Sequence, residues 1–192
     1  MSIYNPVSTR VITGEDTRFS YPNVFEPRSI NGGEPQYDIC LLIPKTDTAT
    51  VNAIRASMEA AYRSGTGTLQ GKGPVPPMDA IRLPLRDGDL ERSDDPAYAG
   101  CWFMNARADV NHRPGIVDAQ AKPIRDRSEF YSGCYGRASV SFFVYNRNGN
   151  RGIGCRLNNL QKLRDGEPLG ERMSAEQEFA PYAEESGEGF LR

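Results

Sequence analysis

Residues 131–163 read YSGCYGRASVSFFVYNRNGNRGIGCRLNNLQKL, and this stretch predicts a long β-hairpin. Every second residue of its first half is apolar, which is the period-two pattern of a half-buried strand: Ala138, Val140, Phe142 and Val144. Asn148-Gly149 follows, and it favours a type I′ turn because both central residues of that turn need a positive φ. The return strand continues the apolar face with Ile153, Cys155 and Leu157. One face of the hairpin is therefore predicted to be a wall of the core.

The opposite face of the hairpin mixes cationic, aromatic and small polar residues. On the first strand it carries Arg137, Ser139, Ser141, Phe143 and Tyr145, and on the return strand Gly154, Arg156 and Asn158. Guanidinium groups beside flat rings suit a flexible polyanion whose bases can stack.

The rest of the chain predicts further strands and one helix. Residues 37–43 alternate with apolar side chains on both faces, which indicates a central strand that Pro44 ends. A helix over residues 51–62 can be capped by Thr46 or Asp47 and closed by Gly65. In the strand at residues 100–107, one face has Trp102, Met104 and Ala106 and the other has Phe103, Asn105 and Arg107.

Shorter elements complete this prediction. We expect two short strands or one bent strand in residues 9–27, short strands at 82–85 and 115–118, and a loop over 65–77. Ser174 and Gln177 can start a short helical turn. Five to seven strands, one main helix and long loops indicate a small β-barrel with an inserted helix.

Length and charge suggest one domain with a distinct C-terminus. At 192 residues the chain is most simply a single domain, here residues 1–175. Residues 176–192 hold five Glu and one Arg, a net −4, which leaves the body at +2 given the total of −2. A mildly basic body with an acidic tail indicates an interaction, while the simpler interpretation is a solubilising, disordered terminus.

Four cysteines occur in or beside apolar runs and form no C-x-x-C pair: Cys40, Cys101, Cys134 and Cys155. We interpret them as buried free thiols of a reducing compartment. Neither a signal sequence nor an apolar run of membrane-spanning length is found, so we expect an intracellular, cytoplasmic protein with no membrane partner.

Signatures of catalysis are weak. His112 is the one histidine, and no nucleophile elbow accompanies it. Residues 65–73 are rich in glycine, yet they do not fit a phosphate loop because Gly73 occupies the position of the magnesium-binding Ser or Thr. The pairs Asp87/Asp89 and Asp94/Asp95 could bind a divalent ion through oxygen, but they are more typical of turns than of a metal site. We therefore expect no enzyme, no metal and no cofactor.

Aromatic and cationic residues recur together and supply the candidate DNA-binding set. Those expected to contact phosphates are Arg107, Arg137, Arg147, Arg151 and Arg156, and those expected to stack on bases are Phe103, Tyr135, Phe143 and Tyr145. The set is completed by Arg18, Tyr21, Tyr131 and Lys162. Trp102 and Phe142 are expected in the core because they fall in the apolar alternation.

Several runs resemble a phage family that is similar to the single-stranded DNA-binding proteins of T7-type phages. The runs are FSYPNVFEP, INGGEPQYDICLLIPK, LRDGD, DDPAYAGCWFMNA, YSGCYGRASVSFFVYN, NGNRGIGCRLNNLQKLRDGEPLGER and the closing GEGF. The resemblance covers nearly the whole chain. It implies an OB-fold, a five-stranded barrel whose groove binds single strands, with a helix inserted after Pro44. It also implies a role in phage DNA replication and recombination, including strand protection.

The resemblance extends to the acidic tail, whose matching residues are Glu184, Glu185, Glu188 and Phe190. It implies that the tail occupies the DNA groove when DNA is absent and, once released, recruits a replicative polymerase or helicase. Leu191 and Arg192 follow the aromatic residue here, which departs from a terminal-aromatic recognition mode.

These observations favour a sequence-tolerant, non-enzymatic single-stranded DNA-binding protein that acts in the host-cell cytoplasm, with a homodimer left open. One alternative is a structural or assembly protein of the virion that uses the same barrel as a packing module. The other is a metal-dependent nuclease that uses Asp87, Asp89, Asp94 or Asp95.

Overall fold

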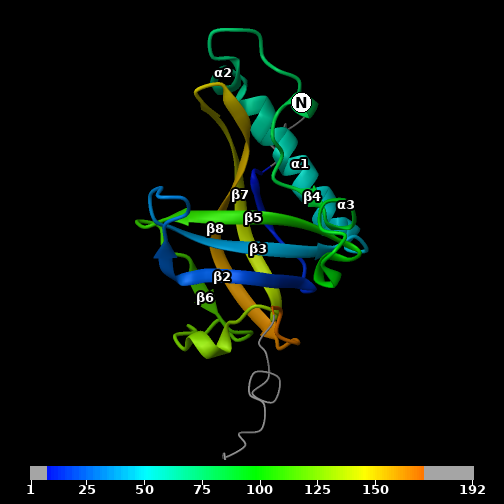
Figure 1. The fold of residues 1–192 in the computed structure, drawn as a ribbon, viewed down its shortest axis with the longest axis vertical. Coiled ribbons are helices and arrows are strands. Elements are labelled where there is room, and N and C mark those ends of the chain that lie inside the picture. Colours follow the sequence, from blue (N-terminus) through cyan, green and yellow to red (C-terminus); the bar gives the residue numbers. More distant parts are fainter. Residues whose placement is uncertain (1–7, 171–192) are drawn as a thin grey trace, which may run out of the picture.

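The structure, a computed structural model, describes residues 8–170 and is dominated by strands (Figure 1). The strands are β1 (Arg10–Ile12), β2 (Thr17–Arg28), β3 (Gln36–Pro44), β4 (Arg86–Asp87), β5 (Cys101–Asp109), β6 (Gly115–Val117), β7 (Tyr135–Arg147) and β8 (Asn150–Arg164). The helices are α1 (Thr48–Ser64), α2 (Thr66–Gln70) and α3 (Gly88–Glu91), with single 3₁₀ turns at Met78–Ala80, Pro96–Tyr98 and Arg127–Glu129. The predicted domain boundary at residues 175/176 and the predicted turn at Ser174 and Gln177 lie outside the described residues.

Five of the strands close into a barrel. The pairing order is β7-β2-β3-β5-β8, and β8 pairs back onto β7. All of these pairs are antiparallel except β5 with β8. Figure 1 shows β2, β3 and β5 crossing the front of the molecule while β7 and β8 run steeply across them. This ring, with α1 inserted between β3 and β5, confirms the predicted five-stranded OB-fold.

The predicted hairpin is confirmed as the longest strand pair of the barrel. Arg147 faces Asn150 across the turn, and Asn148 and Gly149 have φ values of 52° and 85°, as a type I′ turn requires. Phe142 faces Cys155, and both are buried on the inner side. Between Ser139 and Val140, and again at the barrel end of β7, a β-bulge shifts the register.

The interior of the barrel is one apolar cluster, formed by the side chains of alternate residues along each strand. β3 contributes Tyr37, Ile39, Leu41 and Ile43 to this cluster. Its outward residues Cys40 and Leu42 are also buried, in a second cluster with Tyr98 and Phe103. This explains why β3 is apolar on both faces, as a central strand was predicted to be.

Helix α1 has the predicted ends. The side chain of Asp47 accepts a hydrogen bond from the Thr50 N–H at 3.2 Å, and the N–H of Gly65 reaches the carbonyls of Ala61 and Tyr62. Its apolar stripe packs on the core through Val51, Ile54, Met58 and Ala61. None of the helices in the described part of the chain is long and apolar enough to span a membrane.

Two of the minor predictions need correction. Residues 65–77 are not all loop, because α2 forms there and buries Leu69 completely against the core. In residues 82–85 only Arg82 pairs, as an isolated bridge with Gly152, and the short strand β4 comes after them. The secondary structure of both segments depends on contacts with distant parts of the chain rather than on the local sequence pattern.

All four cysteines are free thiols, as predicted. Cys40, Cys134 and Cys155 are buried and Cys101 is half-buried. Burial raises the pKa of each thiol above its ordinary value, because the interior disfavours a thiolate.

The far half of the hairpin extends past the barrel as an arm, defined here as residues 143–152. Figure 1 shows this arm standing beside α1 and α2. Val144 packs against Gly65, and Asn146 Nδ2 donates to the Thr68 carbonyl at 3.2 Å. The arm is therefore held against the helices rather than projecting freely.

Replacing Gly65 with Ala should destabilise the protein by about 1–3 kcal/mol, because a Cβ at this position would overlap the Val144 side chain. Gly67→Ala is the matched control. It lies in α2 with open space around it, so it should be neutral or stabilising by up to about 1 kcal/mol. Urea unfolding of both variants measures the difference, and equal stability would show that the arm does not dock at Gly65.

Candidate nucleic-acid interface

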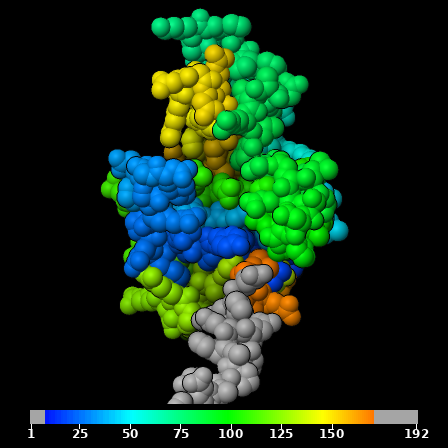
Figure 2. All heavy atoms as spheres, in the orientation of Figure 1, coloured from blue at the N-terminus to red at the C-terminus, as the bar shows by residue number. Residues whose placement is uncertain are grey.

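The outer face of β2, β3 and β5 is hollowed between two raised segments. Figure 2 shows the β2–β3 turn, in blue, and the segment around α3, in green, standing on either side of this face. We call the segment 88–100 the α3 lobe, and the face between the lobe and the turn the groove. Because alternate residues of these strands fill the core, the residues between them point into the groove.

A row of polar side chains crosses the floor of the groove. Asn23 is paired with Asp38, Asp38 with Arg107, and Arg107 with Arg156 of β8. Asp38 accepts hydrogen bonds from Arg28 Nε at 2.9 Å, Arg28 Nη2 at 3.0 Å and Asn23 Nδ2 at 3.2 Å. The hydrogen bond to Asp38 raises the pKa of Arg28. The row therefore joins β2, β3, β5 and β8 into one surface.

The charge of this row is positive. Arg28 neutralises the single carboxylate, Asp38, whose side chain is only 12% exposed. Arg107 and Arg156 are exposed, and neither forms an ion pair with any residue in 8–170. Two uncompensated guanidinium groups side by side are suited to neighbouring phosphates of one strand.

A flat ring lies beside this row on the hairpin. Phe143 is 38% exposed, and its ring lies across Gly154, where a Cβ would collide with it. The guanidinium of Arg156 is 5.2 Å from the centre of the same ring. Tyr145 lies in the same way across Gly152 and is half-buried. Gly152 and Gly154 of β8 thus leave the space that the rings of Tyr145 and Phe143 of β7 occupy.

A second set of rings and cations lies at the other end of the barrel. Tyr135 is half-buried between two guanidinium groups, at 5.1 Å from Arg18 and 4.2 Å from Arg164. Arg18 also donates to the carbonyls of Gly133 at 3.1 Å and Glu167 at 2.6 Å. Its place on β2, paired with Leu42, puts this stack on the rim of the groove.

The side chains of Tyr131 and Lys162 mainly contact other residues of the protein. Lys162 Nζ lies 2.7 Å from Asp165 and 5.2 Å from the centre of the Tyr131 ring, and its side chain is 15% exposed. The hydroxyl of Tyr131 hydrogen-bonds to Asp165 and to the carbonyl of Gly166. This pair fixes the segment that follows β8.

Phe103 corrects the prediction of an exposed stacking ring. It points to the outer face of β5 as expected, but it is 1% exposed beneath the α3 lobe. Tyr98 contacts it edge-on with ring centres 5.1 Å apart, and the guanidinium of Arg86 lies 5.0 Å from it. Alternation along a strand gives the face of a residue, and it cannot show that another segment covers that face.

The remaining predicted cations are spread along the hairpin. Arg147 is exposed and Arg151 half-buried on the arm. Arg137 donates through Nε and Nη2 to Gln161 and lies six residues before Phe143, about 20 Å along the strand. The exposed part of the predicted set therefore lies on the arm, on the groove floor at Arg107 and Arg156, and on the rim near Tyr135, with the groove between the arm and the rim.

Four residues of this surface are absent from the predicted set: Asn23, Arg28, Asp38 and Arg164. Arg28 stands at the end of β2, where the sequence offers no ring beside it, and only its contact with Asp38 brings it to the groove. Counting back from the Asn148-Gly149 turn pairs Tyr135 with Lys162, whereas the bulges in β7–β8 move its partner to Arg164. No local signal in the sequence indicates those bulges.

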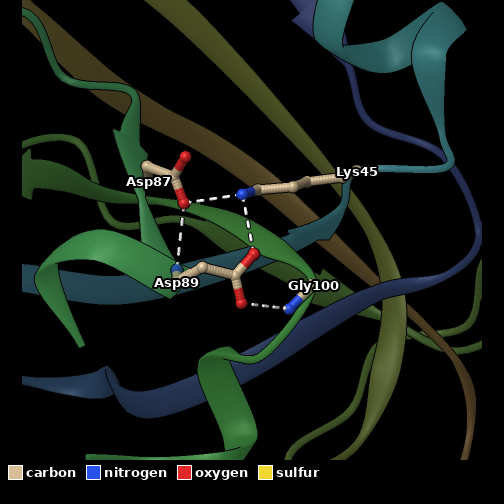
Figure 3. A network of polar contacts seen from close by, with 4 residues as sticks. All are labelled: Lys45, Asp87, Asp89 and Gly100. Carbon is tan, nitrogen blue, oxygen red and sulfur yellow. Dashed lines mark hydrogen bonds and ion pairs between the residues drawn. The ribbon is translucent and has the colours of Figure 1, made fainter. Parts of the chain in front are cut away.

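The candidate metal-binding aspartates hold the α3 lobe in place. Lys45 Nζ lies 2.7 Å from Asp87 Oδ1 and 2.7 Å from Asp89 Oδ2, and Asp89 Oδ1 accepts from the Gly100 N–H at 2.8 Å (Figure 3). Hydrogen bonds from Lys45 lower the pKa of both carboxyls. Asp95 caps a 3₁₀ turn. Across residues 8–170 there is no cluster of three or more His, Cys, Asp or Glu that could hold a metal ion.

Comparison with known proteins gives consistent relatives. Residues 9–191 match a family model described as the ssDNA-binding protein of Enterobacter phage Enc34. Protein p50 of Acyrthosiphon pisum secondary endosymbiont phage 1 is 31% identical over 156 residues, covering 79% of this chain and 82% of that protein.

Solved structures agree. The single-stranded DNA-binding protein of bacteriophage Enc34 in complex with ssDNA superposes with a TM-score of 0.71 at 25% identity, covering 84% of this chain and 90% of that one. The bacteriophage T7 single-stranded DNA-binding protein gp2.5 shares the fold with a TM-score of 0.58 at 16% identity, covering 94% of this chain and 97% of that one.

Replacing Lys45 with Met should loosen the α3 lobe, because Asp87 and Asp89 would then repel each other without their shared cation. Amide hydrogen exchange should become faster in residues 88–100, while exchange in β7 and β8 stays at the wild-type rate. Lys72→Met, at an exposed position outside this network, is the control. Unchanged protection of the lobe would contradict this role of Lys45.

The same network predicts a loss of lobe protection in acid. The pKa values of Asp87 and Asp89 are lowered from the ordinary value of 3.8, so their stabilising effect is complete above that pH. It is lost as the pH falls through the lowered pKa values, because the carboxyls are then protonated. Hydrogen exchange against pH should show this acid limb in the wild type and a weaker one in Lys45→Met.

Proposed function

The chain belongs to the family of phage single-stranded DNA-binding proteins represented by that of Enterobacter phage Enc34, and from this membership we propose that its groove binds single-stranded DNA. The observation that carries the proposal is the continuous surface formed by Arg107 and Arg156 on the floor of the groove and by Phe143 beside them. It combines unpaired cations with an exposed flat ring. The family is one of binding proteins and not of enzymes.

The DNA strand runs across β2, β3 and β5 in the groove, between the β2–β3 turn and the α3 lobe, and the β2–β3 turn and the arm are the loops that contact it. In an OB-fold this is the face, and these are the two loops, that generally bind oligonucleotides. Phosphates bind Arg107 and Arg156, and unpaired bases stack on Phe143 and Tyr145. Arg147 extends the same cationic surface along the arm, whereas Arg151, which is paired with Asn146, lies on the opposite face of the hairpin.

Binding of this kind tolerates any sequence. Every base has a flat face that can stack on a ring, and phosphate contacts do not depend on the base. The proposed role is to protect and organise single strands during phage DNA replication and recombination, in the cytoplasm of the host cell. A homodimer stays a prediction.

Neutralising the phosphate contacts should weaken binding in a salt-dependent way. Arg107→Gln and Arg156→Gln should each reduce the slope of log K against log salt for oligo-dT by about 0.7, the value for one phosphate contact on a single strand. Phe143→Ala should instead cost about 1–3 kcal/mol of binding with the slope unchanged, because the ring carries no charge. Fluorescence anisotropy titrations over a salt series measure both quantities.

Arg63→Gln is the matched control, since Arg63 is exposed on α1 and pairs with Glu59. It should leave affinity and slope at wild-type values. If the wild-type protein fails to bind oligo-dT at low salt, or binds duplex DNA with the same affinity as oligo-dT, the proposal is wrong. Co-purification with virions without salt-dependent DNA binding would favour the alternative of a virion assembly protein.

We also propose that the acidic tail regulates this groove, although Glu184, Glu185, Glu188 and Phe190 lie outside the described residues. The charge difference between a body of +2 and a tail of −4 supports it. In this scheme the tail competes with DNA for the cationic surface. DNA binding then releases it to recruit a replicative polymerase or helicase.

Deleting residues 176–192 should tighten oligo-dT binding at low salt, because a competing polyanion is removed, and the gain should vanish at high salt as the charges are screened. Replacing the five tail glutamates by Gln should reproduce the gain if charge is the cause. Titrations of the three proteins test this, and equal affinity of all three at low salt would contradict competition by the tail.

A further inference from the structure

Strand β2 contains a β-bulge that lifts one tyrosine out of the sheet. Ser20 is paired with Cys40 and Asn23 with Asp38, so Tyr21 and Pro22 together oppose the single residue Ile39. Tyr21 has a φ of 46°, in the left-handed region. Its side chain is 57% exposed, so the bulge presents the ring to solvent.

This backbone conformation is unfavourable for the residue that adopts it. A bulky side chain at positive φ crowds its own backbone, and the residue before a proline prefers an extended conformation. The exposed ring gains little from burial that would offset this strain. Glycine would adopt the same backbone freely, so stability alone does not explain a tyrosine here.

Polar contacts nevertheless fix the bulge. The N–H of Tyr21 donates to Ser132 Oγ at 3.0 Å, and its carbonyl accepts from Asn23 Nδ2 at 3.1 Å. The same Asn23 amide donates to Asp38 on the groove floor. The backbone groups that the bulge removes from the sheet are therefore satisfied, and the bulge is tied to the polar row of the groove.

We propose that the strained bulge positions the ring of Tyr21 to stack on an unpaired base at the point where the DNA strand leaves the groove. This inference rests on the proposed DNA binding. Arg18 lies on one side of Tyr21 along β2 and Arg28 on the other. The phosphates before and after a base stacked on Tyr21 would then lie toward these two cationic side chains. Strain of this kind is retained where it serves a site.

Three variants separate the contributions of the Tyr21 ring, its hydroxyl and its backbone strain to DNA binding and stability. Tyr21→Gly removes the ring and relieves the strain, and Tyr21→Phe keeps the ring and removes the hydroxyl. Ala121→Gly is the matched control, because Ala121 also has a positive φ, 61°, and is exposed in the turn after β6. Each is measured by thermal melting and by anisotropy with oligo-dT and with an abasic oligonucleotide of the same length.

Tyr21→Gly should bind oligo-dT about 5- to 150-fold more weakly than the wild type, with the salt dependence unchanged. It should bind the abasic oligonucleotide as the wild type does, and its melting temperature should change in the same direction as that of Ala121→Gly. Tyr21→Phe and Ala121→Gly should keep wild-type affinity.

The outcomes distinguish this inference from the proposed function. If the wild type binds oligo-dT and Tyr21→Gly binds it equally well, the stacking role of Tyr21 is wrong while DNA binding stands. A Tyr21→Gly protein that melts well below Ala121→Gly would also overturn the inference, because the ring would then serve packing. If the wild type binds neither oligonucleotide, the proposed function itself fails.

Discussion

Pairing of β8 with both β7 and β5 is the constraint on which the rest of the structure depends. It closes five strands into a ring, so alternate side chains fill one core and their neighbours must face outward. Closure also brings Arg156 of β8 beside Arg107 of β5, residues almost fifty positions apart. The cationic surface is thus a direct consequence of the barrel, and no separate element has to build it.

The outward face is then divided between stability and binding. The α3 lobe, held by Lys45, covers the part of β3 and β5 that carries Leu42 and Phe103, and buries them as a second apolar cluster. The part left uncovered carries the polar row around Asp38. A barrel strand with apolar residues on both faces needs such a cover, because exposed apolar surface is unfavourable in water. The cover also forms one wall of the groove.

Two different backbone features position the aromatic rings of this surface: glycines that leave space for a ring, and a strained residue that carries one. In β8, Gly152 and Gly154 lack side chains, so Tyr145 and Phe143 lie flat across the strand at no steric cost. At Tyr21 the backbone itself is forced into the left-handed region, and it is held there because its N–H donates to the Ser132 hydroxyl and its carbonyl accepts from the Asn23 amide. Both arrangements leave an aromatic ring exposed or partly exposed, and at Phe143 the guanidinium of Arg156 lies beside it.

The order of residues alone was enough to predict the hairpin, its turn, strand β3, the caps of α1 and the barrel class, because these follow from alternation, from a turn that needs Asn-Gly and from capping residues that are neighbours in the chain. It also indicated Phe143, Arg156 and Arg107 as outward residues. The folded structure was needed to show that Phe103 is covered, that Tyr135 meets Arg164, and that Arg28 and Asn23 join the groove. Those outcomes depend on bulges and on a lobe that docks from far along the chain, and such long-range contacts leave no periodic trace in the sequence.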